Sequence, residues 1–124
     1  MIEISNEAYH ELVIYAVNNW RGLILLSDNY GIITSIDLLT DTRVSRDIMF
    51  NKVYYTIALS GGDGDLLGKL PFNVRYLQVL NPKTQNIVFV YDLGNTYKIE
   101  DKRDTLTINF VISIPYLREV IGID

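Results

Sequence analysis

Apolar residues recur along the chain with two different periods, which predict one helix followed by a series of strands. Near the N-terminus they return every three or four residues, at Tyr9, Leu12, Val13, Ala16, Val17 and Trp20. This spacing is typical of an amphipathic helix, which we expect over about residues 6–19. Ser5 or Asn6 is placed to cap the first turn of that helix.

The clearest strand covers residues 105–114, where apolar positions alternate strictly with others. One face carries Leu106, Ile108, Phe110, Ile112 and Ile114. The other face carries Thr105, Thr107, Asn109, Val111 and Ser113. This alternation predicts a strand with one buried face. The second face is uncharged and rich in Thr, so we expect it to meet a partner. Pro115 ends the strand, and a helical turn is expected over 116–121.

Two hairpins are predicted between these elements. Residues 22–27 form an apolar run of strand length, residues 28–31 are turn formers, and residues 32–39 are the expected return strand. Residues 72–80 and 87–92 form a second such pair of strands. Because the strands arrive as hairpins, the sheet should be mainly antiparallel.

Four further segments complete the predicted order of elements. Residues 52–60 are rich in β-branched and aromatic side chains and predict a strand. Residues 41–47 are polar and are expected to form a loop or one helical turn. Residues 92–95 are turn formers and predict a break before a short strand at 96–99.

The fold class predicted from this order is α+β, in a single domain covering residues 1–124. We expect the N-terminal amphipathic helix to pack on a mainly antiparallel, curved sheet or small barrel of about six to eight strands.

Composition removes many kinds of chemistry. The chain has one histidine, His10, and no cysteine. Thiol nucleophiles, disulfides, Cys-based zinc sites, Fe–S clusters and two-His metal sites within one chain are therefore excluded. His10 has no orienting partner suggested by spacing, so a surface position is favoured over a general base. We assign no catalytic residue, no metal ligand and no cofactor, and an enzymatic function is not favoured.

The charge pattern bears on partners and location. The net charge is −4 with a pI near 4.9, and the basic residues are interspersed with acids. No basic stripe for nucleic acid is present. The longest apolar runs fall far short of the ~20 residues of a membrane helix, and the N-terminus lacks a secretory signal. We expect an intracellular, cytoplasmic protein without nucleic-acid or membrane partners, or a virion protein if its source is viral.

One loop is rich in glycine, at residues 61–68. Its candidate ligand-binding residues are Gly61, Gly62, Asp63, Gly64, Asp65 and the following Lys69. The spacing fails the phosphate-binding P-loop and the calcium EF-hand patterns. Asp63 and Asp65 could hold a cation weakly, although a mobile, solvated loop is the favoured interpretation.

Tyrosine is the residue in excess, with nine copies. Tyrosine suits protein interfaces and sheet surfaces equally. In the adjacent pair Tyr54 and Tyr55, the two side chains must face opposite sides of a strand, so one should point away from the core. The interface candidates are Tyr54, Tyr55, Thr105, Thr107, Asn109 and Ser113.

These observations favour a non-catalytic structural or protein-interaction subunit of a larger homo- or hetero-oligomeric assembly. Abundant Ile, Asn and Tyr with scarce Ala accompany AT-rich genomes, including many phage genomes, so a virion or tail component is the particular expectation. The alternative is a small-ligand-binding β-domain with the 61–68 loop as a lid over an aromatic pocket. A third hypothesis is an acid-catalysed hydrolase using two Asp or Glu residues, for which Asp37, Asp63, Asp65 and Asp92 are the candidates to substitute.

Overall fold

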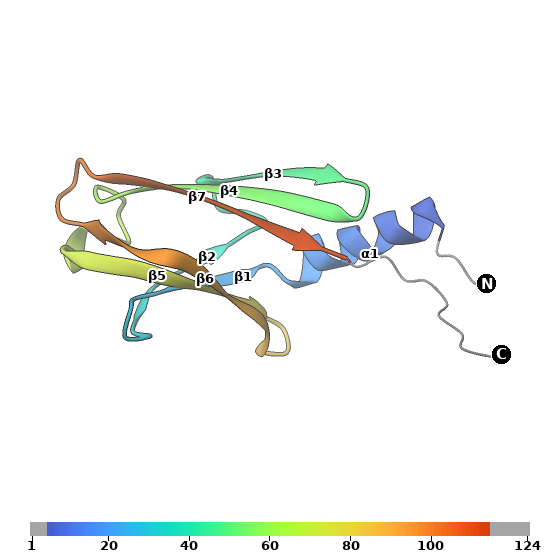
Figure 1. Cartoon of the computed structure of the whole chain (residues 1–124), viewed down its shortest axis with the longest axis horizontal. Coiled ribbons are helices and arrows are strands. Elements are labelled where there is room, and N and C mark those ends of the chain that lie inside the picture. Colours follow the sequence, from blue (N-terminus) through green and yellow to red (C-terminus); the bar gives the residue numbers. More distant parts are fainter. Residues whose placement is uncertain (1–4, 115–124) are drawn as a thin grey trace.

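The computed structural model describes residues 5–114, in which seven strands form two antiparallel sheets stacked face to face (Figure 1). One α-helix extends from one end of this pair of sheets (Figure 1). The fold is therefore α+β with antiparallel sheets, as predicted. The helical turn expected over residues 116–121 lies outside the described residues.

Helix α1 (Asn6–Asn19) has the predicted bounds. The Ser5 side chain caps it by accepting a hydrogen bond from the Ala8 N–H at 3.1 Å. Four residues of the predicted apolar stripe are buried, Tyr9, Val13, Ala16 and Val17, whereas Leu12 is 39% exposed. The helix thus joins the hydrophobic core through one face.

The four-stranded sheet has the order β2–β1–β5–β6. Its strands are β1 (Gly22–Leu26), β2 (Ile32–Asp37), β5 (Phe72–Asn81) and β6 (Asn86–Ile99). β1 pairs with β2 and β5 pairs with β6, which confirms both predicted hairpins.

The predicted break at residues 92–95 is wrong, because β6 continues through it. Tyr76 of β5 pairs with Asp92, and Val74 pairs with Tyr97, so four residues of β6 bulge out opposite one residue of β5. Gly94 takes the positive φ of +82° that this bulge requires. The turn-forming residues are present, but pairing with β5 on both sides keeps the strand continuous.

The three-stranded sheet has the order β3–β4–β7, from β3 (Val44–Met49), β4 (Lys52–Ser60) and β7 (Thr105–Ser113). The strand predictions for β4 and β7 are confirmed. The loop predicted at residues 41–47 is wrong over its second half, where β3 begins. β3 is an edge strand with one exposed face, so polar and charged side chains can lie on it without being buried. These polar residues are the reason that a loop was expected.

The core lies between the two sheets and contains inward-facing side chains from both, together with Val13 and Val17 of α1. The chain passes between the sheets three times, at β2–β3, β4–β5 and β6–β7. No sheet closes on itself within the described residues, so the small barrel expected as one alternative is not formed. β2, β6, β3 and β7 are left as sheet edges.

Candidate functional site

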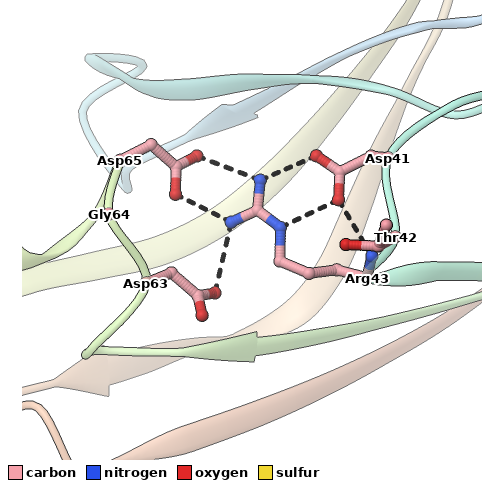
Figure 2. Close-up of a pocket in the computed structure, with 6 residues that line it drawn as sticks. All are labelled: Asp41, Thr42, Arg43, Asp63, Gly64 and Asp65. Carbon is pink, nitrogen blue, oxygen red and sulfur yellow. Dashed lines mark hydrogen bonds and ion pairs between the residues drawn. The ribbon is translucent and has the colours of Figure 1, made fainter.

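The glycine-rich loop joins β4 to β5 and carries two carboxylates that bind the guanidinium of Arg43 (Figure 2). Nη1 of Arg43 lies 2.8 Å from Oδ1 of Asp65 and 3.2 Å from Oδ2 of Asp63. Nη2 lies 2.8 Å from Oδ2 of Asp41, and Nε donates to Oδ1 of Asp41 at 3.0 Å. The cation held by Asp63 and Asp65 is therefore a side chain of the same protein.

Arg43 controls the ionisation of this cluster. Its hydrogen bond to Asp41 raises the pKa of Arg43 against the opposing effect of burial, and the same bond lowers the pKa of Asp41. Burial opposes ionisation of Asp65, but hydrogen bonds from Arg43 and Thr34 outweigh it and lower the pKa of Asp65. Arg43, Asp41 and Asp65 are thus charged at neutral pH.

The same loop connects the two sheets. Oδ2 of Asp65 accepts a hydrogen bond from Oγ1 of Thr34 in β2 at 2.7 Å, and Nζ of Lys69 donates to the carbonyl of Ile33 in the same strand. Arg43 comes directly before β3 in the other sheet. The contacts made by Asp65 and Lys69 therefore have a structural role. Sequence spacing offered no sign of the link to Arg43, because it joins residues 20 and 22 positions apart.

Stability should fall as the solution becomes acidic, because Asp37, Asp41 and Asp65 have lowered pKa values in the folded protein. Carboxylates of this kind stabilise the fold above their unfolded pKa of about 4 and lose that contribution as pH falls through the lower folded value. Urea unfolding at a series of pH values from neutral to strongly acidic should show this decline beginning near pH 4. A free energy of unfolding that stayed level or rose over this range would contradict the account.

The described residues hold no cluster of three or more His, Cys, Asp or Glu suited to a metal ion. In this same part of the chain, no helix combines the length and apolar character needed to cross a bilayer.

Five of the six interface candidates lie on one surface, the outer face of the β3–β4–β7 sheet. Tyr54 points outward from β4, and Thr105, Thr107, Asn109 and Ser113 point outward from β7. The alternation along β7 therefore places them as its pattern predicted. We call this surface, completed by the remaining outward side chains of the three strands, the outer face.

Tyr55 lies on the opposite side of β4, inside the core. It is 1% exposed, and its ring stacks on that of Phe110 with centroids 5.0 Å apart. Burial raises the pKa of Tyr55 despite the nearby charge of Arg46. The surface member of the pair is therefore Tyr54, and the contribution of Tyr55 is to packing.

We expect Tyr55→Phe to leave stability unchanged or to raise it by up to about 1 kcal/mol. The Tyr55 hydroxyl is buried without a hydrogen-bond partner among the described residues, so removing it relieves an uncompensated desolvation cost. The measurement is the free energy of unfolding in urea, with circular dichroism as the probe. A loss above about 1 kcal/mol would show that the hydroxyl has a stabilising partner.

The outer face carries little charge. Among its described side chains, only Asp47 at the β3 edge and Lys52 are charged. Across the strands, Tyr54 pairs with Val111 and Thr56 with Asn109, whose Oδ1 accepts a hydrogen bond from Oγ1 of Thr56 at 2.8 Å. The centre of the face is therefore a hydrogen-bonded, uncharged surface with an exposed aromatic ring.

Two adjoining cavities lie beside β7. One, of about 390 Å³, is lined by residues 54–56 of β4, residues 109–111 of β7 and Tyr91 of β6. The other, of about 230 Å³, is lined by residues 106–109 together with Tyr91, Leu93 and Tyr97 of β6. Tyr91 and Asn109 contribute to both cavities. Sequence reasoning missed the β6 residues at this site, although the tyrosine excess was a sign of such a surface.

These observations define a two-sheet antiparallel β-sandwich with an N-terminal helix and an outer face whose centre is uncharged. No protein-family model matches the chain, and neither a curated protein nor a solved structure shows significant similarity to it. Its function is therefore inferred from the described residues themselves.

Proposed function

We propose that the protein is a non-catalytic interaction subunit of a larger protein assembly, and that the outer face of its β3–β4–β7 sheet binds the partner. The observation that carries this proposal is the gathering of uncharged, hydroxyl-bearing and aromatic side chains on one side of one sheet. Tyr54 and Val111, which pair across two strands, are 38% and 40% exposed.

The composition of the face supports a protein partner. The centres of protein interfaces are depleted in charged residues, because charges lose hydration when a partner covers them. Thr and Asn side chains have a lower desolvation cost and can exchange water for hydrogen bonds to a partner. The exposed ring of Tyr54 and the side chain of Met49, 57% exposed, add apolar area near the β3–β4 end.

The particular assembly proposed is a virion or tail structure, on the amino-acid usage alone. The partner is then either a second copy of the chain or a different structural protein. The ligand-binding alternative gains no support from the cavity beside the glycine-rich loop, because its described lining contains no aromatic side chain.

The hydrolase alternative also lacks support in the geometry. Each of its four candidate carboxylates is paired with an arginine: Asp37 with Arg21, Asp63 and Asp65 with Arg43, and Asp92 with Arg75. Hydrogen bonds from Arg21 and from the Gly94 N–H are the largest causes that lower the pKa values of Asp37 and Asp92, respectively. A general acid needs a raised pKa, so these shifts have the opposite sign.

A pair of matched lysine substitutions tests the proposal. Asn109→Lys places a charge at the centre of the outer face, whereas Ser35→Lys places one at an exposed strand position of the other sheet. We expect a partner recovered from the source cells, or a second copy of the chain, to bind wild type and Ser35→Lys but not Asn109→Lys. Thermal unfolding of both variants shows that each is folded. Equal binding by the two lysine variants would overturn the proposal.

A further inference from the structure

The four sheet edges of the described structure differ in how they are protected against pairing with another strand. β2 has a register irregularity where it meets β1, β3 carries Arg46 and Asp47, and β6 has its four-residue bulge and Lys98. Charges and bulges of this kind prevent edge-to-edge association. Thr105–Ser113 in β7 contains no charged residue, no proline and no register shift in its pairing with β4. It is the one unprotected edge among these strands.

Every second residue of β7 directs its backbone N–H and C=O groups away from β4, toward the free edge of the sheet. Hydrogen bonds at the two ends of the β4–β7 ladder, from Gly61 to Asp104 and from Ile114 to Asn51, mark the hydrogen-bonded pairs. These pairs alternate along an antiparallel ladder, so Ile108, Phe110 and Ile112 bond to β4. The N–H and C=O groups of the outward-facing residues, Asn109 among them, therefore point away from β4.

We propose that β7 pairs antiparallel with β7 of a second copy of this chain, with Asn109 on the two-fold axis, to join two three-stranded sheets into one six-stranded sheet. This inference rests on the proposed interaction role and names a partner that meets the outer face at its β7 edge. If Thr105–Ser113 pairs along its whole length with the same segment of the second copy, the central residue of the strand lies opposite its own copy. That residue is Asn109. In this register Thr107 faces Val111, and Thr105 faces Ser113.

The pattern of β7 is complementary to itself in that register. Outward residues face outward residues and core residues face core residues, because the alternation has a period of two and the register is centred on a residue. No like charges meet, which matters for a chain of net charge −4. The Asn109 amide both donates and accepts hydrogen bonds, so it can pair with its own copy.

The surroundings of β7 leave room for this strand. The cavity of about 230 Å³ runs beside residues 106–109, and its other wall is formed by Tyr91, Leu93 and Tyr97 of β6. The core side of the arriving strand faces these uncharged side chains. Burial of the two exposed tyrosines adds apolar contact to the backbone hydrogen bonds.

Single cysteines test the register without ambiguity, because the natural chain has none. Across an antiparallel hydrogen-bonded pair the Cα atoms are about 5.5 Å apart, within the range of a disulfide. Under mild oxidation, Asn109→Cys should form a covalent dimer with itself. Thr107→Cys alone should not, because its own copy is about 14 Å away along the strands, but it should crosslink when mixed with Val111→Cys. Ser35→Cys is the exposed control.

The outcomes separate this inference from the proposed function. Crosslinking of Asn109→Cys and of the mixed pair, in clear excess over Ser35→Cys, supports the β7 dimer. Crosslinking no greater than that of Ser35→Cys overturns it. In that case, if Asn109→Lys still abolishes binding of a different protein, the interaction role stands with another partner. If no binding depends on the outer face, both proposals fall.

Discussion

Arg43→Met is expected to lower the free energy of unfolding by about 2 kcal/mol, between the effect of breaking an exposed ion pair and that of breaking a buried one. The substitution keeps most of the side-chain volume but leaves Asp41, Asp63 and Asp65 facing one another without a counter-charge. The Arg43 side chain is only 19% exposed, so solvent compensates poorly for the loss. The contacts that hold the glycine-rich loop to the start of β3 are lost with it.

Arg75→Met is the matched control for this substitution. It removes a single ion pair to Asp92, whose side chain is 52% exposed, and should cost less than about 1 kcal/mol. Arg43→Lys should fall between wild type and Arg43→Met, because an ammonium keeps the charge without the planar fork that reaches three carboxylates. Urea unfolding at neutral pH measures all three variants. Equal effects of Arg43→Met and Arg75→Met would show that the cluster contributes no more than a surface pair.

The pH dependence gives the Arg43 prediction a second readout. The pKa values of Asp41 and Asp65 lie below their ordinary range because of Arg43. Their stabilising contribution is present above about pH 4 and disappears as the pH falls through their folded pKa values. The difference in stability between wild type and Arg43→Met should therefore shrink in acid. A difference that stayed constant to strongly acidic pH would contradict the assigned cause.

Gly61→Ala is expected to destabilise the protein by about 3 kcal/mol, the upper range for overpacking a rigid site. A Cβ atom on Gly61 would lie 2.2 Å from the carbonyl oxygen of Asp101 and 3.2 Å from Cγ2 of Ile99. The first of these contacts is to backbone, which a rotamer change cannot move. The N–H of Gly61 is also bonded to the carbonyl of Asp104 at 2.9 Å, so the strand end has little freedom to shift.

Gly64→Ala in the same loop is the control, because a Cβ atom there would meet nothing within 4 Å. Its effect should stay within about 0.5 kcal/mol. Thermal and urea unfolding of the two alanine variants compare a glycine required by close packing with one that is not. Similar stabilities for the two would show that the loop tolerates the added methyl group by moving.

The pair of glycines also shows why the loop could not be interpreted from sequence. Its glycine content suggested a ligand loop or a mobile segment, whereas Gly61 is there for the close approach of the β6–β7 connection. That approach joins residues about forty positions apart, as the bond from Gly61 to Asp104 shows. The link from Arg43 to Asp63 and Asp65 is likewise a tertiary contact. Periodicity describes which way a side chain faces, but it does not say which distant residue it meets.

Elements with one buried face were predictable, because periodicity shows which side of an element faces the core. Helix α1 and strands β4 and β7 each carry a regular apolar stripe, and the outer-face residues of β7 followed directly from it. β3 was not predicted, because an edge strand with polar outward residues has the composition of a loop. The division of the strands into two sheets could not be predicted from the sequence either. A hairpin pattern identifies two strands that pair, but it does not show which sheet they join.

The mass of the protein in solution tests whether two copies pair through β7. It is measured by light scattering after size exclusion over a series of concentrations. Wild type and Ser35→Lys should reach twice the 14.2 kDa of one chain as the concentration rises. Asn109→Lys should remain at the mass of one chain, because it would set two like charges against each other across the axis. A wild type that stays monomeric throughout and binds no other protein through its outer face would contradict the account.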